Sequence, residues 1–215
     1  MALALIDPIL SPYTNGSTTI STALEAANHI AVNWPDNGLE NHICNALDAS
    51  KVYKAWLKAM PTKKPPAIKT YQSNYDKRND AAVDSEIIAN GDTLDSGQIL
   101  FHGGLWTGGK GSMVTTRPLS TTFNPNVAFV EVLHRSKAYD AGRLDLIVMT
   151  TKTATTKAFV FNGRGNHAHE REVLLPANTT LTFVRETCLR TDLNVAKAGL
   201  PDKTIPVFVV EVEVS

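Results

Sequence analysis

Long apolar runs, clustered cysteines and an excess of charge are all missing from this 215-residue sequence. No stretch approaches the roughly 20 apolar residues that a membrane-spanning helix needs. The first eight residues lack the basic segment that opens a secretory signal peptide. We therefore expect no membrane partner, no signal peptide and a cytoplasmic site of action. If the protein leaves its cell, it does so by a route that this sequence does not encode.

The scarcity of cysteine excludes a disulfide framework and the common zinc motifs. Cys44 and Cys188 are the only two cysteines, and neither belongs to a C-x-x-C or zinc-finger spacing. A single disulfide between them stays open, but two buried thiols are the favoured interpretation. We expect no metal.

The charges balance, with 21 basic and 21 acidic side chains. The whole protein is therefore not drawn electrostatically to nucleic acid or to an anionic membrane, although a local patch remains open. The content of 43% apolar and 20% charged residues is that of an ordinary globular protein. The length suits one large domain, or a compact domain with a helical extension.

Hydrophobic periodicity divides the chain near Gly91. Residues 1–90 read as an arm followed by helices, predicted from Ser17 to about Trp34, from Leu39 to Met60, and within Ile68–Asn90. Residues 91–215 read as a β-rich core with one helix after Asn124. The strands are predicted at 98–102, 118–123, 144–150, 157–161, 172–175, 179–185 and 205–214. Strands joined by turns, with one intervening helix, predict an α+β protein with packed antiparallel-type sheets and not alternating βαβ units.

Two carboxylates stand one residue apart at the start of an apolar strand, in His169-Glu170-Arg171-Glu172-Val173-Leu174-Leu175-Pro176. Side chains alternate along an extended chain, so Glu170 and Glu172 are expected on one side, with Arg171 pointing away. Two acids on one wall must differ in environment or in proton occupancy, which allows them different chemical roles.

Three short motifs follow one another at strand edges. They are Leu100-Phe101-His102-Gly103, then Leu119-Ser120-Thr121-Thr122-Phe123, then the Glu170-Arg171-Glu172 stretch. In this order and spacing they resemble the three motifs of the mono-ADP-ribosyltransferases, including bacterial toxins and phage-encoded enzymes. The resemblance runs from Gln98 to the C-terminus. It implies a split β-sandwich of two sheets, packed by the N-terminal helices, that forms a cleft for NAD.

The resemblance also implies roles for individual residues. Glu172 would be the catalytic glutamate, Glu170 its partner in the acceptor reaction, and Ser120 the residue that steadies the acid. NAD would be the co-substrate, bound at His102 and its neighbours Phe101, Gly103, Thr121 and Thr122. The turn at 162–168 would recognise the target.

One departure from the family pattern concerns the first strand, where arginine-specific members carry an Arg and this chain has His102. A His lacks the planar fork with which Arg grips a diphosphate. Arg117 or Lys110 would have to supply that contact.

The nature of the acceptor follows from Glu170. In the family resemblance, Glu at the first position of the pair goes with transfer to a protein arginine, whereas Gln goes with other acceptors. RNA is the alternative acceptor, guided by a local basic patch of Lys63, Lys64, Lys69, Lys77 and Arg78. Hydrolysis of NAD without any acceptor is a further alternative. A cognate inhibitor or immunity protein is an expected partner of a toxin or effector.

Two readings of another class stay open at this point. His167, His169 and Glu172 resemble the metal-binding cluster of the cupins, although the second cupin motif does not follow. A non-catalytic binding protein with a degenerate cleft is the remaining alternative.

Overall fold

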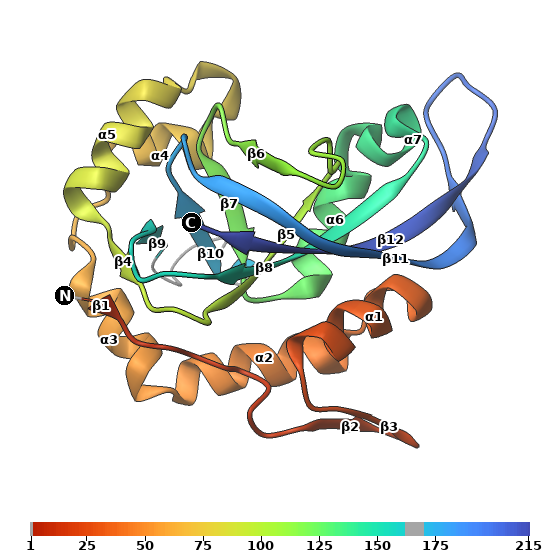
Figure 1. The fold of residues 1–215 in the computed structure, drawn as a ribbon, viewed down its shortest axis with the longest axis horizontal. Coiled ribbons are helices and arrows are strands. Elements are labelled where there is room, and N and C mark those ends of the chain that lie inside the picture. The colour runs from red at the N-terminus through yellow and green to blue at the C-terminus, as the bar shows by residue number, and fades with distance from the viewer. Residues whose placement is uncertain (1, 162–169) are drawn as a thin grey trace.

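A large mixed sheet with helices around it forms the protein (Figure 1). The structure is a computed structural model that describes residues 2–161 and 170–215. Ten strands lie in the order β1-β4-β9-β10-β7-β5-β8-β12-β11-β6, and β2 and β3 form a separate hairpin. The predicted α+β class is confirmed.

The strands of the large sheet differ strongly in length. β11 and β12 make a long antiparallel hairpin, and β8 runs parallel to β12 along its whole length. The bounds are β1 Ala2–Leu3, β2 Tyr13–Asn15, β3 Thr18–Ile20, β4 Asp92–Leu94, β5 Ile99–Gly104, β6 Ser112–Val114, β7 Leu119–Thr122, β8 Leu144–Thr151, β9 Lys157–Val160, β10 Glu172–Leu175, β11 Thr180–Val195 and β12 Lys203–Val214.

The sheet has a narrow seam between β5 and β7. These two strands are joined by a single residue pair, Phe101 with Thr122. On either side of the seam the pairing is continuous. All of β5, from Ile99 to Gly104, pairs with β8, and all of β7, from Leu119 to Thr122, pairs with β10. The expected sandwich of two separate sheets is therefore one sheet in two halves, because this pair bridges them.

Several helices pack against the large sheet. Figure 1 shows α1, α2 and α3 following one another along one side, while α5 packs against β9. α6 packs on β5 and β8 beside the seam. The bounds are α1 Ala23–Asn33, α2 Asn37–Ala49, α3 Lys51–Ala59, α4 Pro66–Ser73, α5 Asp80–Asn90, α6 Pro125–Leu133 and α7 Lys137–Ala141.

The helical region and the β-rich region share one hydrophobic core. Trp56 and Tyr53 of α3 are fully buried and contact Phe123, which follows β7. β1 pairs in parallel with β4, which brings the first residues into the same sheet as the strands beyond residue 91. The two predicted regions are therefore packed together as one body.

The predicted helices are too long because side-chain caps interrupt them. Ser50 ends α2, and its hydroxyl accepts a hydrogen bond from the Tyr53 amide at 3.1 Å, so the predicted helix 39–60 is two helices. Asn79 caps α5 in the same way and splits the third helix. The first helix begins at Ala23, after a capping box of Thr22 and Glu25.

Several strand predictions also needed correction. Residues 18–20 are β3 and not helix, since Gly16 at φ 58 turns the chain into a hairpin. The strand predicted at 179–185 continues to Val195, and β6 was missed. The strand predicted at 172–175 is confirmed.

The expectation of two buried thiols was wrong. Both cysteines are free, but Cys44 is half-buried and Cys188 is exposed. Cys188 lies in the middle of β11, where residues 184–188 are all exposed. Among residues 2–161 and 170–215, no helix is long and apolar enough to cross a membrane.

Candidate active site

Three side chains that are far apart in the sequence meet beside the seam. The Ser120 hydroxyl donates a hydrogen bond to Oε1 of Glu172 at 2.6 Å. Nδ1 of His102 lies 2.7 Å from the carbonyl oxygen of the same Ser120. His102 therefore links β5 to β7 across the seam, and Ser120 links β7 to Glu172 on β10.

Strand register explains why Ser120 reaches Glu172. In the antiparallel pair of β7 and β10, Glu172 lies opposite Thr122 and Leu174 lies opposite Ser120. Ser120 and Glu172 are therefore diagonal neighbours on one face, close enough for their side chains to meet. Glu172 is 8% exposed, so its carboxylate is held in a largely dry environment by this hydroxyl.

The hydroxyls of the two threonines after Ser120 form hydrogen bonds to the backbone on either side of Glu172. The buried Thr121 hydroxyl donates to the carbonyl of Val173 at 2.6 Å. The Thr122 hydroxyl donates to the carbonyl of Glu170 and accepts a bond from the Asn124 amide. Both hydroxyls thus hold the backbone around Glu172, and their predicted contact with NAD stays a prediction.

On β5, Phe101 and Gly103 have packing roles that the sequence prediction did not include. Phe101 is 2% exposed at the seam pair. A Cβ on Gly103 would stand 1.8 Å from the carbonyl oxygen of Ala128, so only glycine allows α6 to lie this close to the strand. Their predicted contact with NAD also stays a prediction.

His102 is held as a neutral imidazole with one nitrogen available. Burial lowers the pKa of His102, and Lys137 and Arg117 nearby lower it further, against the opposing effect of the Ser120 carbonyl. A carbonyl can only accept, so Nδ1 carries the proton in this bond and Nε2 is left as an acceptor. A Cβ on Gly104 would stand 2.6 Å from Nε2, so this glycine leaves that nitrogen its space.

The two glutamates are not arranged by simple strand alternation. β10 begins at Glu172, and Arg171 before it has φ 47, in the left-handed region. Glu170 therefore lies before the strand, so the strand alternation assumed for the two acids does not apply, and their position on one side stays a prediction. The backbone of Glu170 is held beside β7, because the Thr122 hydroxyl donates a hydrogen bond to its carbonyl oxygen.

Arg171, which was expected to point away from the two glutamates, is largely buried. Its side chain is 9% exposed, and Nη2 donates to Oδ2 of Asp48 at 2.7 Å. The guanidinium also lies 5.9 Å from the ring centre of Tyr53. The residue between the two glutamates thus ties their turn to α2 and α3. No sequence pattern marked Asp48 as its partner.

Lys64 and Tyr71 lie within the electrostatic reach of Glu172. Burial lowers the pKa of Lys64, and the charge of Glu172 acts in the opposite direction. Burial raises the pKa of Tyr71 strongly, and Glu172 raises it further. Both residues come from the segment between α3 and α5, and the motifs alone did not point to Tyr71.

Arg117 is the better placed of the two cations predicted to replace the missing arginine. It donates to the Tyr75 hydroxyl at 3.3 Å and affects both His102 and Tyr71 electrostatically. Lys110 instead lines a separate hollow with Trp106, Arg143 and Phe183. A diphosphate contact by Arg117 stays a prediction.

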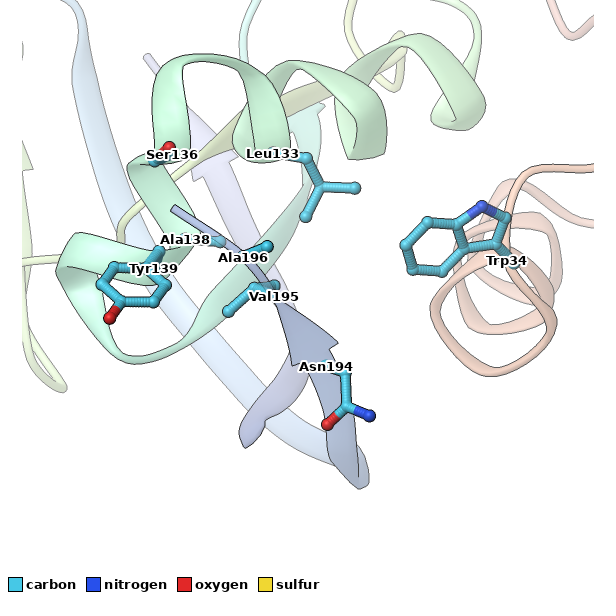
Figure 2. A pocket seen from close by; sticks show the side chains of 8 residues that line it. All are labelled: Trp34, Leu133, Ser136, Ala138, Tyr139, Asn194, Val195 and Ala196. Carbon is cyan, nitrogen blue, oxygen red and sulfur yellow. The ribbon is translucent and has the colours of Figure 1, made fainter. Parts of the chain in front are cut away.

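Two surface hollows lie away from this cluster. One of ≈ 510 Å³ contains Lys110, and the other, of ≈ 170 Å³, lies between the end of α1, α7 and the end of β11. Figure 2 shows the second, with Trp34 facing Leu133 and Val195 across it. Neither hollow is lined by His102, Ser120 or Glu172. A cleft at the cluster therefore stays a prediction.

The cupin-like reading gains no support from the described residues. Residues 2–161 and 170–215 contain no group of three His, Cys, Asp or Glu side chains that would hold a metal ion. His167 and His169 lie outside the described residues, as does the predicted recognition turn at 162–168. The sheet ends at the edge strands β1 and β6 and differs from the closed barrel that the cupin reading requires.

The cluster presents a fixed carboxylate beside a neutral imidazole acceptor. A carboxylate held in place by a hydroxyl donor needs no reorganisation to stabilise positive charge that develops on a bound substrate. The cations Lys64 and Arg117 nearby suit an anionic part of the same substrate.

Searches of known proteins found similarity in three dimensions only. No protein-family model matches the chain, and no curated protein matches it. The ADP-ribosyltransferase Vis, solved with the inhibitor M6, is 15% identical, with 87% of this chain and 90% of that chain covered and a TM-score of 0.49. C3larvin toxin from Paenibacillus larvae, an ADP-ribosyltransferase, is 13% identical, with 77% and 94% covered and a TM-score of 0.44.

A longer protein is similar as well. The enzymatic component C2-I of the C2-toxin from Clostridium botulinum is 11% identical, with 76% of this chain and 45% of that chain covered and a TM-score of 0.46. The matched part thus spans less than half of C2-I. At identities and TM-scores this low, residue roles rest on the geometry of the cluster itself.

Proposed function

We propose that this protein transfers ADP-ribose from NAD to a macromolecular acceptor and releases nicotinamide. The observation that carries the proposal is the meeting of His102, Ser120 and Glu172 through bonds of 2.7 Å and 2.6 Å. Three separate sequence motifs predicted this chemistry, and they converge on one place beside the seam.

The chemistry follows from the carboxylate. Breaking the bond between nicotinamide and ribose builds positive charge on the sugar, which Glu172 would stabilise while accepting a hydrogen bond from the ribose 2′-hydroxyl. Ser120 orients the carboxylate, and Nε2 of His102 would accept a hydrogen bond from a hydroxyl or amide of NAD. The described residues fit NAD, since Lys64 and Arg117 offer positive charge for its diphosphate.

For the acceptor, we propose an arginine side chain of a target protein. A guanidinium is protonated at any ordinary pH, and in that form it is not a nucleophile. A carboxylate must therefore orient the arginine and accept a proton from it as it attacks. Glu170 suits this role because Thr122 fixes its backbone two residues before Glu172. Its side chain is half-buried and so retains access from outside.

The test is NAD cleavage by purified variants. Glu172→Gln keeps the shape and removes the charge, so release of nicotinamide should fall by about 10²–10³-fold. Glu213→Gln on β12 serves as the matched control and should retain full activity. Unchanged cleavage in Glu172→Gln would refute the proposed reaction.

Glu170→Gln separates the acceptor step from NAD cleavage. With labelled NAD and an arginine analogue, this variant should lose transfer but keep the hydrolysis of NAD to ADP-ribose and nicotinamide. If transfer and hydrolysis fall together, the arginine assignment is wrong. Wild-type label in a lysate that is lost to ribonuclease and not to protease would make RNA the acceptor.

A further inference from the structure

The chain between Asp48 and Asp76 carries basic charges and no acidic ones, and it contributes residues next to the candidate site. Between Asp48 and Asp76 there are six lysines and no acidic residue, in a protein whose total charge is zero. Five of the six are exposed, and Lys64 is half-buried. We refer to this set as the lysine strip, formed by Lys51, Lys54, Lys58, Lys63, Lys64 and Lys69.

The helix α3 aligns half of the strip. Lys51, Lys54 and Lys58 recur at three- and four-residue spacing, so they project from one face, while Tyr53 and Trp56 on the opposite face are buried. With a rise of about 1.5 Å per residue, these three ammonium groups follow a line of about 10 Å. The remaining lysines continue from the end of α3 into α4.

The lysines of the strip form no ion pair within the described protein, and Lys64 is affected by the charge of Glu172. None of the ion pairs among residues 2–161 and 170–215 includes one of these six lysines. Three lysines elsewhere are paired, Lys137 with Glu131, Lys152 with Glu213 and Lys197 with Asp140, and they provide a matched control for the unpaired strip. Lys69 also lowers the pKa of Lys64, which shows that like charges lie close together here.

The composition of the strip indicates which anionic partner fits. Interfaces between proteins are depleted in Lys and enriched in aromatic residues, Met and Arg, which is the opposite of this surface. A helix that lies on a membrane needs an apolar face to insert, but the apolar face of α3 is already in the core. Interfaces with nucleic acids are polar and strongly positive.

We propose that the lysine strip is a binding surface for nucleic acid, held through its phosphates. Lysine acts as a point charge toward phosphate and does not read bases, so binding should be insensitive to sequence. Within the strip, Lys64 interacts electrostatically with Glu172. A strand bound at Lys64 would therefore pass close to the candidate site.

The proposal is tested apart from the proposed reaction, because nucleic-acid binding is measured in the absence of NAD. The experiment measures the fluorescence anisotropy of a labelled 16-nucleotide RNA of mixed sequence between 50 and 200 mM KCl. If all six lysines meet phosphates, log K should fall with log salt at a slope of about −4, which is about a 300-fold loss over this range.

The triple variant Lys51→Ala, Lys54→Ala, Lys58→Ala should reduce the slope to about −2, or about a 20-fold loss over the same range. Alanine preserves the helix. The control variant Lys137→Ala, Lys152→Ala, Lys197→Ala removes the same charge from other surfaces and should keep the wild-type slope.

Three results would overturn the proposal. The first is no RNA binding by the wild type at 50 mM KCl. The second is an equal loss of slope in both triple variants, which would indicate an unspecific effect of net charge. The third is binding of phosphatidylserine vesicles or polyglutamate, but not RNA, that depends on the strip. NAD cleavage measured on the same preparations tests the proposed reaction separately.

Discussion

The ion pair between Arg171 and Asp48 predicts an unusual asymmetry between its two partners. The Arg171 side chain is 9% exposed, whereas that of Asp48 is 61% exposed, and Nη2 and Oδ2 are 2.7 Å apart. Among residues 2–161 and 170–215, the buried Nε of Arg171 has no hydrogen-bond partner. Removing the exposed partner should therefore harm the protein more than removing the buried one.

The magnitudes follow from what each variant leaves behind. Asp48→Ala leaves a buried guanidinium with fewer acceptors, and a hydrogen bond between charged groups contributes about 1.5–3 kcal/mol. Because solvent screens Asp48, we expect a loss of about 2 kcal/mol. Arg171→Met keeps the apolar stem against Tyr53 and leaves Asp48 in water, so its cost should stay below about 1 kcal/mol.

Urea denaturation of the wild type, both single variants and the double variant provides the measurement. The double variant should be about as stable as Arg171→Met alone, because Asp48 no longer has a buried charge to neutralise. The reasoning would be refuted if Asp48→Ala were as stable as the wild type, or if Arg171→Met were less stable than Asp48→Ala. NAD cleavage by the variants would then report how far the Glu170–Glu172 turn depends on this link.

Two further predictions concern β5. Gly103→Ala should destabilise the protein by about 3 kcal/mol, because its Cβ would meet the Ala128 carbonyl at 1.8 Å, while Gly111→Ala, whose nearest atom is 3.7 Å away, should be nearly neutral by thermal denaturation. Because burial lowers the pKa of His102, the unfolded chain binds its proton more readily. Stability should then fall as the pH drops below the unfolded pKa of about 6.5. Urea titrations at pH 7 and pH 5 give the free energy of unfolding at each pH. Between pH 7 and pH 5, the His102→Asn variant should lose less of this free energy than the wild type, and an equal loss would contradict the lowered pKa of His102.

Local patterns in the sequence predicted much of the β-rich core. The strand at 172–175 and the helix start at Asn124-Pro125 are found where apolar runs and capping residues placed them. The helices were predicted less well, because Ser50 and Asn79 look like interior residues until their side chains are seen to cap a new helix. Capping depends on backbone direction, which a hydrophobic pattern does not encode.

The candidate site was predictable as a set of residues but not as an arrangement. His102, Ser120 and Glu172 meet, yet the alternation assumed for Glu170 and Glu172 fails because Arg171 adopts φ 47. The partner that buries Arg171 is Asp48, 123 residues earlier. A contact over such a separation depends on the tertiary placement of α2 beside the segment before β10, and no pattern near either residue predicts it.

At the seam between β5 and β7, a side chain replaces part of the missing ladder. The strands share one backbone pair, and the bond from His102 to the Ser120 carbonyl is a second link across them. The same imidazole ring offers Nε2 on its other side. A molecule that binds Nε2 would therefore contact the same side chain that links the two half-sheets.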